Sequence, residues 1–354
     1  MIRKLRQFSI CLLLLTAFYG LTAQDFHYSQ FTNGPLHLSP GLTGVFGGQT
    51  RINTNFRSQW RQVPVSYRTF SVTADHKYNC GNQGPGFFAS GIALNYDRAG
   101  DSRLTWANVG FYGSYTHPLN KRSFLTGGMT IGLGQRSFDT DDLRFGAQFD
   151  PLMGIFSENL SNMEEFARSS HLFADFGFGV NFRWQALNRG TLLDLLNKRS
   201  KLDVGIGIHH LNGPDMSFVD GIKDKLPMRI SPYAAANIQV LDPLDLRLAF
   251  TAQFQRSYRE YVGQAGINFY GNRSPGRQWS LLVAVGLRFD DFNDAWFPAL
   301  ELNYHETIKA AVSYDFNISD FERATNSRGG LELNIRYLIR KVCPLPDFKF
   351  CPLI

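Results

Sequence analysis

Apolar and polar residues alternate at every second position along most of the chain. Residues 307–317 show the pattern as two interleaved sets, Ile308, Ala310, Val312, Tyr314 and Phe316 against Lys309, Ala311, Ser313, Asp315 and Asn317. A period of two residues is that of a β-strand, in which successive side chains point to opposite faces. Because one set keeps its charges while the other is aliphatic and aromatic, we expect the apolar face to contact lipid rather than a protein core.

The alternation recurs in segments that are bounded by turn residues, and this predicts fourteen strands. They cover 48–57, 67–78, 86–97, 103–117, 122–137, 169–185, 200–211, 227–240, 244–256, 259–271, 277–290, 295–304, 307–317 and 328–341. Several exceed about ten residues, the length that a tilted membrane strand requires, whereas strands in soluble β-sandwiches usually have about five or six. An even strand number brings both ends of the sheet to one side. The sequence therefore predicts an all-β fold, a single transmembrane antiparallel β-barrel with both termini in the periplasm.

The first 23 residues have a different pattern from the rest of the chain. Arg3, Lys4 and Arg6 precede an apolar run from Ile10 to Phe18. A cleavage site with small residues follows at 21–23. These are the three parts of a signal peptide, so the mature chain is expected to begin at Gln24. No later window has the roughly 18 apolar residues of a helical membrane span. We therefore expect export and integration into the outer membrane of a Gram-negative bacterium without a helical anchor.

No Pro/Ser/Gly linker and no shift in composition divides the rest of the chain. We expect residues 1–23 to be the signal peptide, 24–47 an N-terminal segment that folds into the lumen as a plug, 48–341 the outer-membrane barrel and 342–354 a periplasmic tail. Charged residues make up 19% and aromatic residues 14% of the chain, which fits strands with one lipid-facing and one water-facing side. The net charge of +6 is scattered, and the absence of a dense Lys/Arg run argues against a nucleic-acid surface.

The polar faces of the predicted strands carry charges of both signs in similar numbers. Candidate members of a lumen network are Arg183, Asp175, Lys201, Asp203, Arg247, Glu301, Lys309, Asp315, Glu332 and Arg336. An ion-selective pore needs a ring of one sign, whereas mixed charges can pair across the lumen and hold a plug. Inward glycines such as Gly179 and Gly207 indicate either crowding beside a plug or bends in the strands. We expect a largely closed lumen, and a porin-like or hydrophobic-solute channel is the alternative.

Residues that could support catalysis are few. On a strand, neighbours point to opposite faces, so His209 and His210 cannot share a metal ion, and we expect one at the lipid interface and one in the lumen. The acidic residues between Asp139 and Asp142 lack the spacing of a calcium loop, and His305 has no Ser or Asp partner nearby in sequence. An outer-membrane hydrolase is therefore the less favoured alternative. No catalytic residue, cofactor or metal is expected.

Three cysteines follow the signal peptide, and the strand count places all of them on the periplasmic side. This compartment is oxidising, so Cys343 and Cys351 are a candidate disulfide that would close a small loop in the tail, with Cys80 left over. Prolines in the tail prevent continued strand pairing. The tail is therefore a candidate docking element for a periplasmic partner.

Motifs along the mature chain are similar to those of a known family. Residues 24–31 and 35–44 resemble the N-terminal signature of the PorP/SprF family, although its usual Asn and Ala are Ser39 and Gly41 here. The segments 55–60, 97–100, 143–148, 210–214 and 313–315 and the Cys-Pro elements at 343–344 and 351–352 follow in the family's order. Within the N-terminal stretch, the candidate plug or docking residues are Gln24, Asp25, Phe31, Pro35 and Pro40.

The resemblance implies an outer-membrane component of the type IX secretion system, associated with gliding motility in some relatives. Such barrels aid the secretion or surface attachment of a partner protein such as an adhesin. They act together with other secretion-system subunits, including periplasmic ones, and with outer-membrane lipid. No enzymatic activity, cofactor or nucleic-acid partner is implied.

Overall fold

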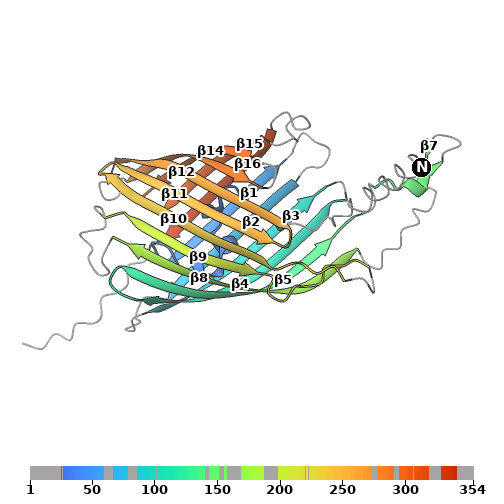
Figure 1. The fold of residues 1–354 in the computed structure, drawn as a ribbon, viewed down its shortest axis with the longest axis horizontal. Coiled ribbons are helices and arrows are strands. Elements are labelled where there is room, and N and C mark those ends of the chain that lie inside the picture. The colour runs from blue at the N-terminus through green and yellow to red at the C-terminus, as the bar shows by residue number, and fades with distance from the viewer. Residues whose placement is uncertain are drawn as a thin grey trace, which may run out of the picture.

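A computed structural model of the chain describes residues 25, 27–59, 67–78, 86–100, 102–139, 143–150, 155–157, 169–186, 198–219, 221, 223–272, 278–290, 295–305, 307–318 and 328–340. Fourteen antiparallel strands close into one barrel (Figure 1), which confirms the predicted fold class. The strands are β1 (Thr50–Gln59), β2 (Tyr67–Tyr78), β3 (Phe87–Ala99), β4 (Leu104–Pro118), β5 (Ser123–Ser137), β8 (Ser170–Gln185), β9 (Lys201–His209), β10 (Arg229–Leu241), β11 (Leu244–Gln255), β12 (Tyr258–Asn272), β13 (Trp279–Phe289), β14 (Ala295–Tyr304), β15 (Ile308–Asn317) and β16 (Arg328–Ile339).

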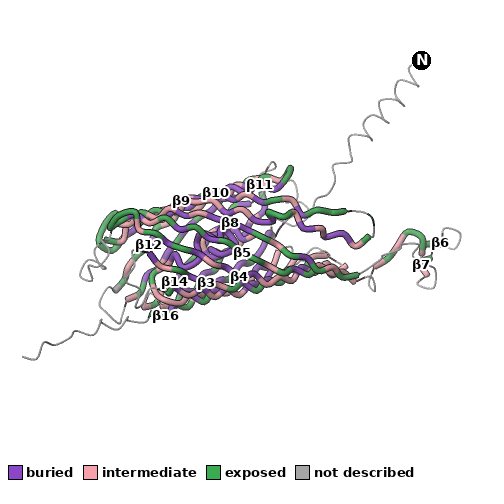
Figure 2. Tube along the Cα trace, turned by 90° about the horizontal axis from the view of Figure 1, so that it is seen from below, coloured by how far each residue is buried: buried purple, intermediate pink, exposed green. Residues whose placement is uncertain are grey.

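The barrel closes between its first and last strands. β1 pairs with β16 from Thr50 opposite Ile339 to Gln59 opposite Gly330, and every other strand pairs with its neighbours in chain order. β5 pairs directly with β8, because β6 (Phe149–Asp150) and β7 (Ile155–Phe156) form a separate two-stranded hairpin that stands away from the barrel (Figure 2). We call the end at which β1 begins and β16 ends the Thr50 end, and the opposite end the Gln59 end.

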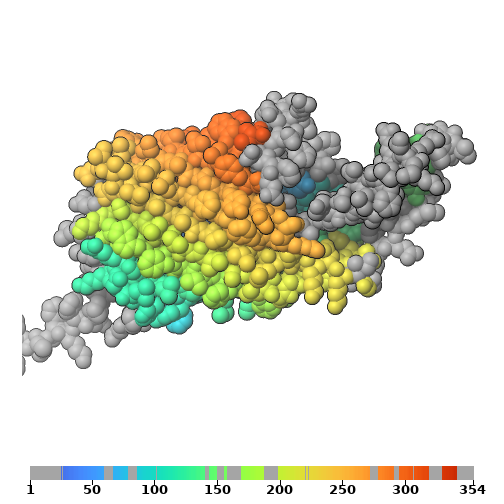
Figure 3. Space-filling model, viewed as in Figure 1, coloured from blue at the N-terminus to red at the C-terminus, as the bar shows by residue number. Residues whose placement is uncertain are grey.

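The outward face of the barrel is apolar and the inward face is polar. Leu133 and Ile335 are about 60% and 59% exposed on the outside, whereas Lys309 and Glu332, at alternating positions, are each 1% exposed on the inside. Figure 3 shows the strands packed side by side into a continuous outer wall. This is the reverse of a water-soluble protein, in which fully buried charges are rare, and it is the arrangement of a barrel whose outer wall faces lipid.

Among the described residues, helices are limited to short turns, and none is long and apolar enough to cross a membrane. Three such turns lie in the N-terminal stretch, η1 (Phe31–Asn33), α2 (Pro35–Leu38) and η2 (Pro40–Leu42), and a fourth, η3 (Gly146–Gln148), precedes the β6–β7 hairpin. Pro35 and Pro40 open α2 and η2, at the position where a missing N–H costs least.

Candidate functional site in the barrel lumen

The chain before β1 runs lengthwise through the lumen. We call residues 25 and 27–47 the N-terminal segment. At one extreme the main-chain N–H of Asp25 donates to Gln255, the last residue of β11, at 3.3 Å. At the other, Lys77 near the Thr50 end of β2 donates to the carbonyl of Phe46 at 2.6 Å. The segment therefore crosses from the Gln59 end to the Thr50 end, and nearly all its residues from 28 to 45 are buried.

This path changes the expectation for the chain ends. The start of β1 and the end of β16 do lie at one end of the barrel, as an even strand number requires. Asp25, however, lies toward the opposite end, because about 20 residues that precede β1 turn back through the lumen. The start of β1 and the end of β16 therefore share one end of the barrel and Asp25 lies toward the other, while the two chain termini lie outside the described residues.

One side of the N-terminal segment is apolar and packs on one wall of the barrel. Phe31, Leu38, Leu42 and Val45 form a single buried cluster with inward residues of β10–β14, namely Tyr233, Ala249, Val262, Leu282, Ala284, Phe297 and Ala299. Burial of such side chains contributes roughly 1.5–3 kcal/mol each. The lumen is therefore not uniformly polar, and it has an apolar strip that matches the apolar side of the segment.

A second wall is made of glycines that let the segment approach the strands closely. A Cβ on Gly128 of β5 would lie 2.2 Å from the carbonyl oxygen of Pro40, and one on Gly207 of β9 would lie 2.1 Å from that of Leu38. A Cβ on Gly179 of β8 would lie 2.2 Å from Ser39 Oγ. Gly41 itself has backbone atoms of 179–180 within 2.9 Å of the position of a Cβ. Crowding by the segment, rather than strand bending, explains Gly179 and Gly207.

The remaining walls hold the segment mainly by its main chain. Glu332 accepts the N–H groups of Ser29 and Gln30 at 2.9 and 3.0 Å, and Asp75 accepts that of Gly44 at 2.8 Å. Lumen side chains donate to carbonyls of the segment in the same way, and these donors are Arg51, Asn53, Arg57, Lys77, Ser114, Arg183 and Arg229. Because these contacts do not depend on the side chains of the segment, no residue pattern within it could have indicated them.

A buried ion cluster fixes the segment near the Gln59 end. Asp315 of β15 lies 2.9 Å from Arg57 and 3.0 Å from Arg288, and it accepts a hydrogen bond from Ser29 Oγ at 2.9 Å. All three charged side chains are almost fully buried. The cluster therefore joins β1, β13, β15 and the segment through one carboxylate.

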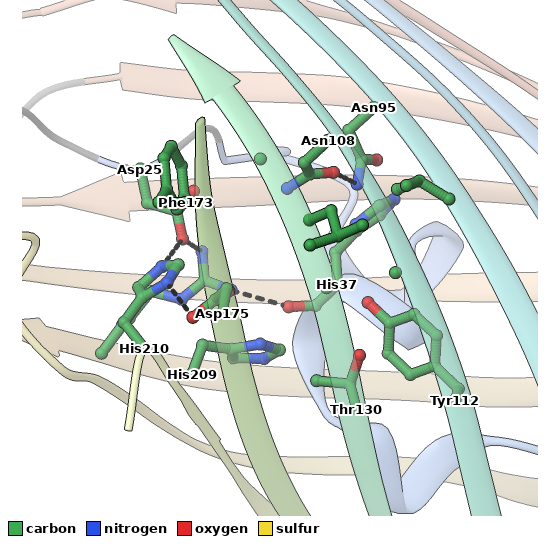
Figure 4. Close-up of a pocket in the computed structure, with 16 residues that line it drawn as sticks. Asp25, His37, Asn95, Asn108, Tyr112, Thr130, Phe173, Asp175, His209 and His210 are labelled. Carbon is green, nitrogen blue, oxygen red and sulfur yellow. Dashed lines mark hydrogen bonds and ion pairs between the residues drawn. The ribbon is translucent and has the colours of Figure 1, made fainter. Parts of the chain in front are cut away.

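Asp25 is held by a second polar cluster, which Figure 4 shows. Its Oδ2 lies 2.6 Å from an Nη of Arg229 and 3.0 Å from Nε2 of His210, whose Nδ1 lies 3.0 Å from Asp175. Arg229 also donates to the carbonyl of His37 at 2.9 Å. We call Asp25, Asp175, His210 and Arg229 the latch. It lines a small cavity that also includes His37 and Tyr112.

Burial and charge set the protonation states in and near the latch. Burial opposes ionisation of Asp25, but the charges of Arg229 and His210 hold its pKa below the usual range. Burial also opposes the charge on His210, but hydrogen bonds to Asp175 and Asp25 raise its pKa to about 9. For His37, burial and then the charge of Arg229 lower the pKa to about 4. At neutral pH Asp25 and His210 are therefore charged and His37 is neutral.

The histidine pair differs from the sequence expectation. β9 ends at His209, and His210 has φ 59°, in the left-handed region, so the alternation stops at this point. Both side chains are buried inside the barrel, at 6% and 4% exposure, and neither lies at the lipid interface.

The predicted lumen residues are found at inward positions, and the structure gives their partners. Arg183 binds Asp203 with two contacts of 2.8 Å, so the partner of Arg183 is Asp203 and not Asp175, which binds His210. Glu301 is shared by Arg247 at 2.8 Å and Lys309 at 3.0 Å. Neither Lys201 nor Arg336 has an ion pair within 4 Å among the described residues. Arg336 donates a hydrogen bond to Asn303 at 3.5 Å, and the charge of Glu301 also acts on it.

Sequence reasoning missed several members of the lumen network. Arg51 and Asp75 pair at 2.8 Å, and both occupy polar positions of predicted strands, so the alternation itself could have selected them. Arg229 lies at the start of β10, where no pattern marks it. Gln24, Cys80, Cys343 and Cys351 lie outside the described residues, and the candidate disulfide stays a prediction. Across the described ranges, no group of three or more His, Cys, Asp or Glu side chains is placed to hold a metal ion.

Comparisons with known proteins give the following similarities. The Ralstonia pickettii toluene transporter TbuX is 12% identical over 88% of this chain and 94% of its own, with a TM-score of 0.48. A Pseudomonas aeruginosa FadL homologue is 13% identical over 84% and 92%, with a TM-score of 0.47. No curated protein matches the chain. A family model described as type IX secretion system membrane protein PorP/SprF matches residues 21–337.

Proposed function

The chain belongs to the PorP/SprF family of type IX secretion system membrane proteins, and on this premise we propose that it is a non-enzymatic accessory barrel of that system, which aids the secretion or surface attachment of a partner protein such as an adhesin. It is an integral outer-membrane protein. The family match over residues 21–337 is the observation that carries the proposal.

The closed lumen favours a platform over a channel. The N-terminal segment is held along its length by an apolar strip, a glycine wall and two ionic clusters. Conduction through the barrel would require all of these contacts to break. A porin-like or hydrophobic-solute channel is therefore the weaker candidate, and cargo is expected to bind the ends of the barrel rather than pass through it.

Within this proposal the regions of the chain have separate roles. Residues 1–23 are a signal peptide, 24–47 a plug, 48–341 the barrel and 342–354 a tail in the periplasm, where it contacts another subunit of the secretion system. The Thr50 end then faces the periplasm and the Gln59 end faces outward. The two longest connections between barrel strands join β5 to β8 and β9 to β10, which meet at the Gln59 end, as expected for the outside loops of an outer-membrane barrel.

Affinity purification of the full-length protein from cross-linked outer membranes tests the proposal. We expect it to retain other secretion-system subunits and at least one secreted protein, while an unrelated outer-membrane barrel purified in parallel retains neither. Recovery of only the proteins that the control barrel also retains would reject the proposal.

A deletion tests the role of the tail separately. Removing residues 343–354 should abolish display of the secreted partner while the barrel still shows heat-dependent migration in gels. Unchanged display would reject the tail as the docking element and leave the accessory role of the barrel intact.

A further inference from the structure

Positive charge accumulates inside the Thr50 end of the lumen. Besides Arg51, Lys77 and Arg199, five inward cations of the described residues lie there near two carboxylates that they share, Asp203 and Glu301. The cations are Arg183, Lys201, Arg247, Lys309 and Arg336, from β8, β9, β11, β15 and β16. We call these seven residues the cationic vestibule. Asp75 and Asp245, which also lie at this end, are already paired with Arg51 and Arg199.

The two carboxylates of the vestibule are already bound by other cations. Both oxygens of Asp203 bind Arg183 at 2.8 Å, and one of them also accepts from Asn181. Glu301 uses one oxygen for Arg247 and the other for Lys309. Among the described residues, neither Lys201 nor Arg336 has a carboxylate within 4 Å, although the charges of Asp203 and Glu301 still act on them.

The positions of Lys201 and Arg336 indicate space for a missing anion. Arg336 lies directly opposite Lys309 in the β15–β16 register, a like-charge pairing that disfavours the folded sheet. Its Nε is buried and has no hydrogen-bond partner. Lys201 is exposed toward the lumen, close enough to Arg183, Arg247 and Arg336 for their charges to act on it. β9 and β16 are seven strands apart in the fourteen-strand barrel, so Lys201 and Arg336 present their charges to the Thr50 end of the lumen from opposite walls.

We propose that the cationic vestibule is a binding site for a carboxylate or phosphate group that enters from the Thr50 end, with Lys201 and Arg336 as its main donors. The planar guanidinium of Arg336 matches the two oxygens of either group, and the ammonium of Lys201 adds a mobile point charge. The anion restores the charge balance that Asp203 and Glu301 leave incomplete. Its source is either a small oxyanion or acidic side chains of a polypeptide.

Calorimetric titration of the full-length protein in neutral detergent tests the site, with inorganic phosphate and hexaglutamate as probes. We expect at least one probe to bind, and Lys201→Gln and Arg336→Gln each to weaken binding by about tenfold or more, since each removes a charge-assisted contact. Added salt should weaken binding as well. Binding of hexaglutamate alone identifies peptide carboxylates as the ligand, and comparable binding of phosphate identifies a small oxyanion.

Two further variants separate binding from folding. Asn303→Asp keeps every cation but places a carboxylate beside Arg336, so it should abolish binding while the barrel stays folded, as judged by its heat-dependent migration. Lys121→Gln removes a cation from the exposed turn between β4 and β5 at the same end, and it should leave binding unchanged. If neither probe binds the unaltered protein, or if all four variants bind as it does, the vestibule is not an anion site.

Discussion

The two ends of the lumen contain similar residue types in opposite arrangements. Near the Gln59 end, Arg57 lies opposite Glu332 in the β1–β16 register, and Asp315 contacts both Arg57 and Arg288. Near the Thr50 end, Lys309 lies opposite Arg336, and two cations share Glu301. The first end satisfies its charges internally and through the N-terminal segment, whereas the second has cations in excess. The inward charges of the strands sum to nearly zero, but excess positive charge lies at the Thr50 end of the barrel axis.

The largest effect should come from removing the shared carboxylate at the Gln59 end. Asp315→Asn keeps the shape of the side chain but leaves Arg57 and Arg288 buried without a counter-charge, which costs about 3–5 kcal/mol of unfolding free energy. Urea unfolding in lipid vesicles measures this loss. Asp139→Asn is the matched control, because Asp139 pairs with Arg103 in an exposed position at 3.4 Å, where an ion pair contributes about 0–1 kcal/mol. Equal stability of the two variants would contradict the difference between buried and exposed pairs.

A smaller effect is expected from the glycine wall. Gly128→Ala puts a methyl group where the carbonyl of Pro40 lies, so it should unseat the N-terminal segment at a cost of about 1–3 kcal/mol. Limited proteolysis of the segment reports its release. The neighbouring Gly127→Ala is the control, because no atom of the described residues lies within 4 Å of its Cβ. If both variants resist protease like the unaltered protein, the segment does not pack on this wall as described.

Binding of the N-terminal segment inside the lumen should weaken both at alkaline and at acidic pH. The pKa of His210 is raised to about 9, so its contribution is complete below about 6.5 and is lost as the pH rises through 9. The pKa of His37 is lowered from its ordinary value of 6.5 to about 4 while the segment is bound in the lumen. Between these two pH values, His37 of a released segment binds a proton that His37 of the bound segment does not. Acidic pH therefore favours release of the segment. Protease sensitivity should be lowest near neutral pH. His210→Gln should remove the rise in protease sensitivity at alkaline pH, and His37→Gln should remove the rise at acidic pH. Protease sensitivity that does not change with pH in the unaltered protein would contradict both assignments.

The smallest effect is expected at the Thr50 end. Arg336→Gln removes a cation that faces Lys309 and has no carboxylate, so the free energy of unfolding should change by less than about 0.5 kcal/mol or increase slightly. Measured beside Asp315→Asn, this variant sharpens the contrast between the two ends. A loss as large as that for Asp315→Asn would mean that the cations at the Thr50 end are balanced after all.

The strands could be predicted from the sequence because lipid on one side and water on the other impose the alternation. Tyr67–Tyr78 and Ala295–Tyr304 have the predicted bounds. The partners of the charged residues could not be predicted, because they depend on the register between strands: Arg183 lies opposite Asp203 in β8–β9, and nothing in either strand alone specifies this. The path of the N-terminal segment was equally inaccessible, because its main chain carries most of its contacts. At His210 a single residue in the left-handed region ends the strand, although the alternation in the sequence continues to Leu211.

The central claim is that the N-terminal segment closes the lumen of the folded barrel. Single-channel recording of the purified protein in planar lipid bilayers tests it most directly, with a variant that lacks residues 25–45 as the comparison. We expect no large, steady current from the unaltered protein and a stable open-pore current from the deletion variant. A large, steady current from the unaltered protein would show that the segment does not close the lumen.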